Sequence, residues 1–120
     1  MRVAVVGSRT FSDFALLKSH LDRLDDVEMI VSGGAKGADS LAELWARQNS
    51  IPTQIFRADW RKHGKSAGII RNREIVANAD LIVAFWDGES KGTEYTVEFG
   101  RKKGVEVQIV PFSVPFREGE

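Results

Sequence analysis

Short apolar runs alternate along the chain with longer segments in which apolar residues recur at every third or fourth position. A short run predicts a buried strand, and the wider spacing predicts a helix with one apolar face. The run at 80–86 is almost continuously apolar, which is typical of a central parallel strand covered on both faces. The expected strands cover residues 3–6, 28–31, 53–57, 80–86 and 105–110.

Each expected helix lies between two of these strands, which is the pattern of a parallel sheet in a three-layer α/β/α domain. Ser12 stands where it can cap the first helix. Trp45 lies on the apolar stripe of the second helix, so we assign it to the core. Gly104 ends the last helix. The expected helices cover about residues 14–24, 41–48, 66–78 and 93–103.

The composition is that of one globular domain. With 120 residues, 42% of them hydrophobic, the chain is long enough to bury its own core, and we place the domain at 1–111 and a tail at 112–120. No stretch approaches the ~20 apolar residues of a membrane span. Because cysteine is absent, disulfides are excluded, and we expect a cytoplasmic protein without a membrane partner. Phe112 and Phe116 in the tail need burial, for which the second subunit of a homodimer is one candidate.

The charges are balanced, with 17 basic and 17 acidic residues. Such a chain lacks the overall positive field of a dedicated nucleic-acid binder, although a local basic patch is compatible with this balance. His20 and His63 lie far apart in the sequence, with no carboxylate cluster beside them at ligand spacing. We therefore expect no metal and no cofactor.

Three glycine-bearing loops follow predicted strands. In open α/β sheets, ligands bind outside the carboxyl ends of the strands, so the three loops predict one shared pocket. Glycine lets backbone N–H groups approach a ligand, and the following helix N-terminus favours an anion, so the expected ligand carries phosphate. Two serines near this pocket have no histidine base and are expected to donate hydrogen bonds to phosphate. The loop residues expected to bind the ligand are Gly7, Ser8, Arg9, Ser32, Gly33, Gly34, Lys36, Gly37, Asp39, Ser90, Lys91, Gly92 and Thr93.

The irregular stretch 58–65 combines cations with an aromatic residue and follows the third strand, so it opens onto the same crevice or is a solvated surface loop. In the next helix, Ile69, Arg73 and Val76 are expected to face inward, with Asn72 on or beside that stripe. Further residues expected at the pocket are Asp59, Trp60, Lys65, Ser66, Arg71, Asn72 and Trp86.

Six short motifs together resemble the YspA-like branch of the SLOG superfamily, whose relatives include LOG phosphoribohydrolases and bacterial DNA-processing proteins. The resemblance runs from the first strand to the fifth. It implies a Rossmann-like sheet with strand order 3-2-1-4-5 and a nucleotide-type ligand. The motifs are Gly7–Arg9, Gly33–Asp39, Ala58–Trp60, Gly64–Gly68, Arg71–Glu74 and Ser90–Thr93.

The members of the superfamily that this chain resembles differ in function. LOG-type enzymes carry a glutamate where this chain has Thr96, which weakens a hydrolase assignment. Glu94 could substitute for it, and Asp39 is a candidate base or ribose ligand, although either carboxylate also suits a helix N-terminus. We favour a module that binds a nucleotide or an ADP-ribose-like molecule, as a sensor or to sequester it. The alternative is a nucleoside 5'-monophosphate N-glycosidase. Single-stranded DNA binding is a third hypothesis, which the neutral charge disfavours.

Overall fold

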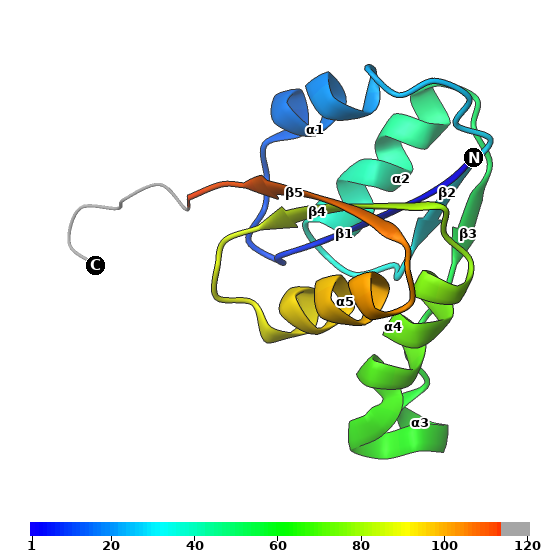
Figure 1. Cartoon of the computed structure of the whole chain (residues 1–120), viewed down its shortest axis with the longest axis vertical. Helices are drawn as coiled ribbons and strands as arrows, with labels where there is room; N and C mark the ends of the chain where they lie inside the picture. Colours follow the sequence, from blue (N-terminus) through cyan, green and yellow to red (C-terminus); the bar gives the residue numbers. More distant parts are fainter. Residues whose placement is uncertain (114–120) are drawn as a thin grey trace.

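The protein, described here by a computed structural model over residues 1–113, is built on a five-stranded parallel sheet (Figure 1). The strand order is β3-β2-β1-β4-β5, so the Rossmann-like α/β/α fold and the expected order are confirmed. The sequence pattern places each strand to within two residues of its observed bounds at either end. The strands are β1 Arg2–Gly7, β2 Met29–Ser32, β3 Thr53–Ile55, β4 Leu81–Trp86 and β5 Glu106–Pro111.

Helices cover both faces of this sheet. The expected cap of the first helix was wrong: the side chain of Asp13, not that of Ser12, accepts a hydrogen bond from the Leu16 N–H at 3.0 Å. The helix also stops at Leu21, one turn earlier than Leu24 suggested. The helices are α1 Phe14–Leu21, α2 Ala38–Gln48, α3 Trp60–His63, α4 Ala67–Ala77 and α5 Lys91–Lys102, with a 3-10 turn, η1, at Gly64–Ser66.

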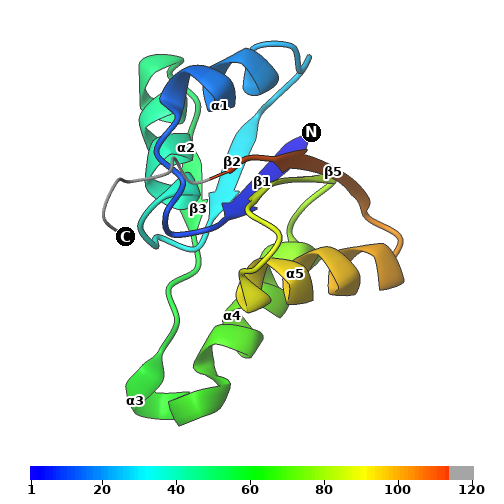
Figure 2. The same cartoon turned by 90° about the vertical axis from the view of Figure 1, so that its left-hand side faces the viewer.

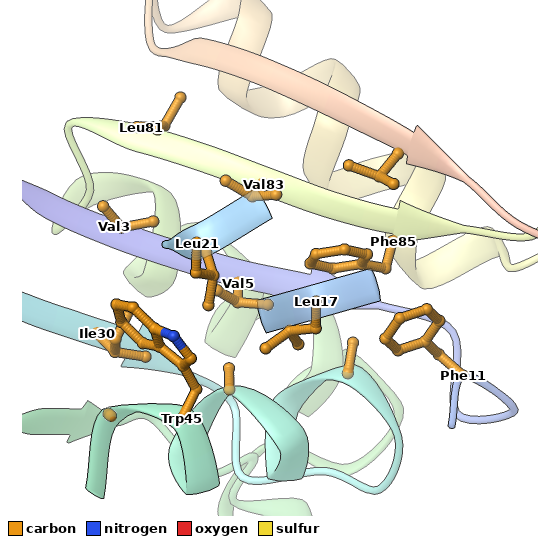
Figure 3. Packing of buried hydrophobic residues seen from close by; sticks show 14 residues of the cluster. Val3, Val5, Phe11, Leu17, Leu21, Ile30, Trp45, Leu81, Val83 and Phe85 are labelled. Carbon is orange, nitrogen blue, oxygen red and sulfur yellow. The ribbon is translucent and has the colours of Figure 1, made fainter. Parts of the chain in front are cut away.

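One apolar core lies between the sheet and helices α1 and α2 (Figure 3). Phe11, just after β1, stacks on Phe85 of β4 with ring centroids 4.8 Å apart. Trp45 is buried in this core, as expected, and its indole N–H donates to Asp22 at 2.9 Å. Phe112 packs edge-on against Phe11 with ring centroids 4.8 Å apart, so this tail residue contacts its own domain. Phe116 lies outside the described residues.

A second core lies between the opposite face of the sheet and helices α4 and α5. Alternate residues of β1 serve the two cores, since Val3 and Val5 face α1 and α2 while Ala4 and Val6 face α4 and α5. Of the expected inward stripe of α4, Val76 is buried, as expected, but Ile69 is 45% exposed and Arg73 is exposed. The other buried residues of that helix are Ala67 and Ile75.

The segment 58–65 was expected to be irregular, but all of it after Asp59 belongs to α3 or to the start of η1. The side chain of Asp59 caps α3 by accepting from the Lys62 N–H at 3.1 Å. Figure 2 shows α3 projecting away from the sheet, beyond the start of α4. None of the helices within residues 1–113 is long and apolar enough to cross a membrane.

Candidate functional site

The main cavity has a volume of about 370 Å³ and opens at the carboxyl ends of β1 and β4. These two strands are neighbours, and the chain leaves them toward opposite faces of the sheet, so the cavity lies at the topological switch point where α/β proteins bind ligands. Its size falls within the range of about 300–1,000 Å³ that is usual for small-molecule sites. It is lined by Val6, Gly7, Ser8, Arg9, Thr10, Ala35, Asp39, Arg71, Asn72, Ile75, Asp87, Ser90, Gly92, Thr93 and Thr96.

The loop after β1 forms one wall, and it is held by close packing. A Cβ atom at Gly7 would lie 2.5 Å from the carbonyl oxygen of Phe85, so only glycine lets β1 and β4 approach here. Ser8 is buried; its N–H donates to that same Phe85 carbonyl at 3.0 Å, and its hydroxyl accepts from the Asp87 N–H at 3.3 Å. Arg9 follows at an exposed position on the cavity rim.

Asp39, in the first turn of α2, is a nearly buried carboxylate in the cavity wall. One of its oxygens, Oδ2, accepts from the N–H groups of Gly33 and Ala35, both at 3.1 Å. Burial raises the pKa of Asp39 above the ordinary 3.8, while the two backbone hydrogen bonds and the nearby Arg71 oppose this rise. The β2–α2 loop is therefore folded around this carboxylate.

Arg71 and Asn72 of α4 close another side of the cavity. The Arg71 guanidinium donates from Nη1 to the carbonyl oxygen of Gly33 at 2.9 Å and from Nε to Oδ1 of Asn72 at 3.0 Å. These two bonds fix the plane of the guanidinium, and the half-buried Asn72 thus has the polar partner that its position called for.

The N-terminus of α5 completes the wall. The N-cap is Ser90, whose hydroxyl lies 3.1 Å from the hydroxyl of Thr93. Thr96 is buried and donates its hydroxyl hydrogen to the Gly92 carbonyl at 2.9 Å. A Cβ atom added at Gly92 would meet no atom within 4 Å, so this glycine leaves open space at the cavity.

Asp87 stands just before this helix and lines the same cavity. Its Oδ1 accepts from the Glu89 N–H at 2.8 Å and from the Ser90 N–H at 2.9 Å. These backbone hydrogen bonds lower the pKa of Asp87. The main cavity thus holds two carboxylates in contrasting surroundings, Asp39 buried and Asp87 partly exposed.

A second cavity, of about 220 Å³, adjoins the main one. The two share Arg9, Ala35 and Arg71, which form a common wall. The second cavity extends from this wall over the β2–α2 loop toward β3 and α3. Its lining residues are Arg9, Gly33, Gly34, Ala35, Arg57, Ala58, Trp60 and Arg71.

Most of the residues expected at the pocket line one or both cavities. The others have other partners or lie farther away. Ser32 donates its hydroxyl hydrogen to Glu43 at 2.8 Å, and the indole N–H of Trp86 donates to the Ser90 carbonyl at 3.0 Å. Glu94 faces Lys91, with 3.9 Å between the charged atoms. The expected residues that line neither cavity are Ser32, Lys36, Gly37, Asp59, Lys65, Ser66, Trp86, Lys91 and Glu94.

Thr10 and Asp87 belong to the glycine-bearing loops expected at the pocket, although neither was named as a ligand-binding residue. Arg57 and Thr96 line a cavity and were not expected there. Arg57 follows the end of β3 by two residues, and this position at the carboxyl edge of the sheet is the signal in the sequence that points to it. Thr96 was considered only as a replacement for a glutamate. Within residues 1–113, no three His, Asp or Glu side chains come together in a way that could hold a metal ion.

Comparison with known proteins identifies the family of the chain. The chain belongs to the YspA, cpYpsA-related SLOG family (YAcAr), which matches residues 1–63. The gene 61 protein of Mycobacterium phage D29 is 40% identical over 116 residues, which cover 88% of this chain and 93% of that protein. The resemblance noted in the sequence motifs is therefore confirmed.

Two solved structures share the fold. DNA processing protein A (DprA) from Streptococcus pneumoniae superposes with a TM-score of 0.79 at 25% identity, over 94% of this chain and 51% of that one. The chain therefore spans about half the length of that protein. DprA from Helicobacter pylori, whose structure concerns its single-stranded DNA binding mode, has a TM-score of 0.66 at 22% identity, over 100% of this chain and 67% of that one. At this identity the likeness shows the fold alone.

Proposed function

We propose that this protein binds a nucleotide or a nucleotide-derived small molecule in the main cavity, as a sensor or to sequester it. One observation carries the proposal: Arg9 and Arg71 line a cavity that also receives the N-terminus of the twelve-residue helix α5. Guanidinium groups bind phosphate oxygens with charge-assisted hydrogen bonds, and a helix N-terminus adds N–H donors and a positive dipole end.

The remaining lining groups suit the uncharged part of a nucleotide. The Asp39 and Asp87 carboxylates and the Asn72 amide can accept hydrogen bonds from ribose hydroxyls or from a base, while Val6 and Ile75 offer an apolar surface. A ligand with a phosphate at one end and a sugar and base at the other would therefore find complementary groups in this cavity.

The alternative, hydrolysis of an N-glycosidic bond, rests on Asp39. This carboxylate lines the cavity and has a raised pKa, as a general acid or base often has. However, Thr96 occupies the place of the LOG glutamate, and Glu94 does not line the cavity. Asp39 also has a structural role, because it accepts hydrogen bonds from the backbone N–H groups of Gly33 and Ala35. Release of free base from AMP, measured by chromatography and lost in Asp39→Asn, would favour the enzyme over the binding module.

Single-stranded DNA binding is a candidate function because the structure of the Helicobacter pylori protein concerns this binding. At 22% identity, that protein shares only the fold with this chain. The equal numbers of basic and acidic residues argue against a chain that neutralises many phosphates. An oligonucleotide therefore belongs in the binding panel as the competing ligand, with tight and salt-sensitive binding as the result that would favour it.

Calorimetric titration tests the proposal. We expect AMP or another nucleoside phosphate to bind, and the matching nucleoside to bind at least about tenfold more weakly because it lacks the charged partner of the arginines. Arg71→Ala should weaken nucleotide binding by a similar factor. Arg101→Ala removes the same charge from an exposed position in the last turn of α5 and should leave affinity unchanged. If no nucleotide binds, or if nucleoside and nucleotide bind equally, the proposal is wrong.

A further inference from the structure

The second cavity differs from the main one in charge. Three arginines line it, Arg9, Arg57 and Arg71, and no acidic residue does. The main cavity balances two arginines with Asp39 and Asp87. Within residues 1–113, none of the three arginines forms an ion pair with a carboxylate. In a chain with no net charge, three unpaired guanidinium groups around about 220 Å³ are a local concentration of positive charge.

Two of these guanidiniums contact the backbone carbonyls of consecutive glycines. Arg71 donates to the carbonyl oxygen of Gly33 at 2.9 Å, and Arg57 reaches the carbonyl oxygen of Gly34 at 3.4 Å. A Cβ atom at Gly33 would lie 2.6 Å from Nη1 of Arg71, and one at Gly34 would lie 2.9 Å from Nη1 of Arg57. The absence of side chains at both positions lets Arg57, from the loop after β3, and Arg71, from α4, lie close to the same loop.

The two cavities adjoin each other, and the guanidinium-bearing residues Arg9 and Arg71 line both. A phosphate held at this common wall would leave its next substituent directed into either cavity. On the side of the main cavity, the lining fits a sugar and base. On the other side, the substituent would meet Arg57 and Trp60, a residue that is 57% exposed.

We propose that the second cavity is a subsite for a second phosphate, so that the ligand carries a diphosphate group. This inference rests on the proposed function, since the first phosphate and the nucleoside occupy the main cavity and the common wall. Arg57 binds the second phosphate, and Trp60 offers an aromatic face to a ring attached beyond it. The ligand class is therefore a nucleoside diphosphate, or a nucleotide whose diphosphate bridges to a second ring, rather than a nucleoside monophosphate.

Titration of AMP, ADP and ADP-ribose into wild-type protein and Arg57→Ala tests this subsite. We expect the two diphosphates to bind wild-type protein about tenfold or more tightly than AMP. Arg57→Ala should remove most of this advantage while changing AMP affinity less than about twofold. Arg57 is exposed and its one hydrogen bond is long, so the variant should fold. Arg61→Ala, which removes the same charge from an exposed residue of α3 outside the cavity, is the matched control.

Trp60→Ala then distinguishes the two kinds of diphosphate. If it weakens ADP-ribose but not ADP, the ligand bridges to a second ring; if it weakens neither, the diphosphate is terminal. Either result supports the subsite. Equal affinity of wild-type protein for AMP and ADP, or an equal loss for both in Arg57→Ala, would overturn the subsite and leave the proposed function standing. Failure of all three nucleotides to bind would instead contradict the proposed function itself.

Discussion

Arg71 and Gly33, 38 residues apart, are joined by a hydrogen bond of 2.9 Å from the Arg71 guanidinium to the Gly33 carbonyl oxygen. This bond connects α4 to the loop between β2 and α2, and it sets the guanidinium in the wall common to both cavities. The position of the cation therefore depends on the absence of a side chain at Gly33.

Gly33→Ala should accordingly weaken nucleotide binding about as much as Arg71→Ala, roughly tenfold. The new Cβ would lie 2.6 Å from the guanidinium and 2.8 Å from Oδ2 of Asp39, so the arginine must move. Because both variants remove the same interaction, the double variant should bind no more weakly than either single one. Additive losses in calorimetry would show that Gly33 contributes in another way.

Gly34→Ala and Gly92→Ala should have opposite effects on stability. Gly34 has a φ of 71°, and a Cβ there would also crowd Ile55 and Arg57 at 2.9 Å, so alanine should lower the free energy of unfolding by about 1–2 kcal/mol. Gly92 lies in a helix with open space beside it, so alanine at this position should raise the free energy of unfolding by up to about 1 kcal/mol. Urea unfolding of the two variants checks this, and a loss at Gly92 equal to that at Gly34 would contradict it.

Gly92→Leu should block the main cavity without unfolding the protein. The leucine side chain would extend from a position with no atom within 4 Å into the space where we place the ligand. We expect nucleotide binding to fall below detection while the melting temperature stays close to that of the wild type. Glu98→Leu adds the same side chain at an exposed position of the same helix and serves as the control. Unchanged affinity in Gly92→Leu would place the ligand elsewhere.

Asp39→Asn should stabilise the protein in a pH-dependent manner. Since burial raises the pKa of Asp39 above 3.8, the native state retains a proton that the unfolded chain releases, and the wild type loses stability as the pH rises from 3.8 through the raised pKa. Asparagine does not titrate, and its side-chain oxygen can accept the same two backbone hydrogen bonds. The gain in unfolding free energy over the wild type should therefore be smallest near pH 3 and largest near pH 7, as measured in urea. A difference independent of pH would contradict this account.

The sheet could be predicted from the sequence because each buried strand is a compact apolar run, and alternation with helices leaves few arrangements open. The cavity could be predicted in part, since strand ends such as Gly7 and Ser32 must lie at one edge of a parallel sheet. The position of a residue at a strand end does not determine the direction in which its side chain points. Ser32 is an example, because its hydroxyl binds Glu43 rather than facing either cavity.

The presence of a glycine in a loop was also not enough to predict contact with a ligand. At Gly37 a Cβ atom would lie 2.4 Å from the carbonyl oxygen of Ser8, so this glycine permits two loops to touch and lines neither cavity. Arg57 was missed for the converse reason: no glycine stands beside it in the sequence, and its neighbour Gly34 comes from another loop. Such pairs depend on tertiary contacts that spacing along the chain does not reveal.

The most direct measurement of the central claim is an NMR titration of the ¹⁵N-labelled protein with AMP. If the main cavity binds the nucleotide, the largest amide shifts should fall on residues 7–10, 35, 87, 90, 92, 93 and 96, which line it, and Gly92→Leu should abolish them. Residues around α1 and the amino ends of the strands should not shift. Saturable shifts confined to those distant residues, or no shift at millimolar AMP, would contradict the account.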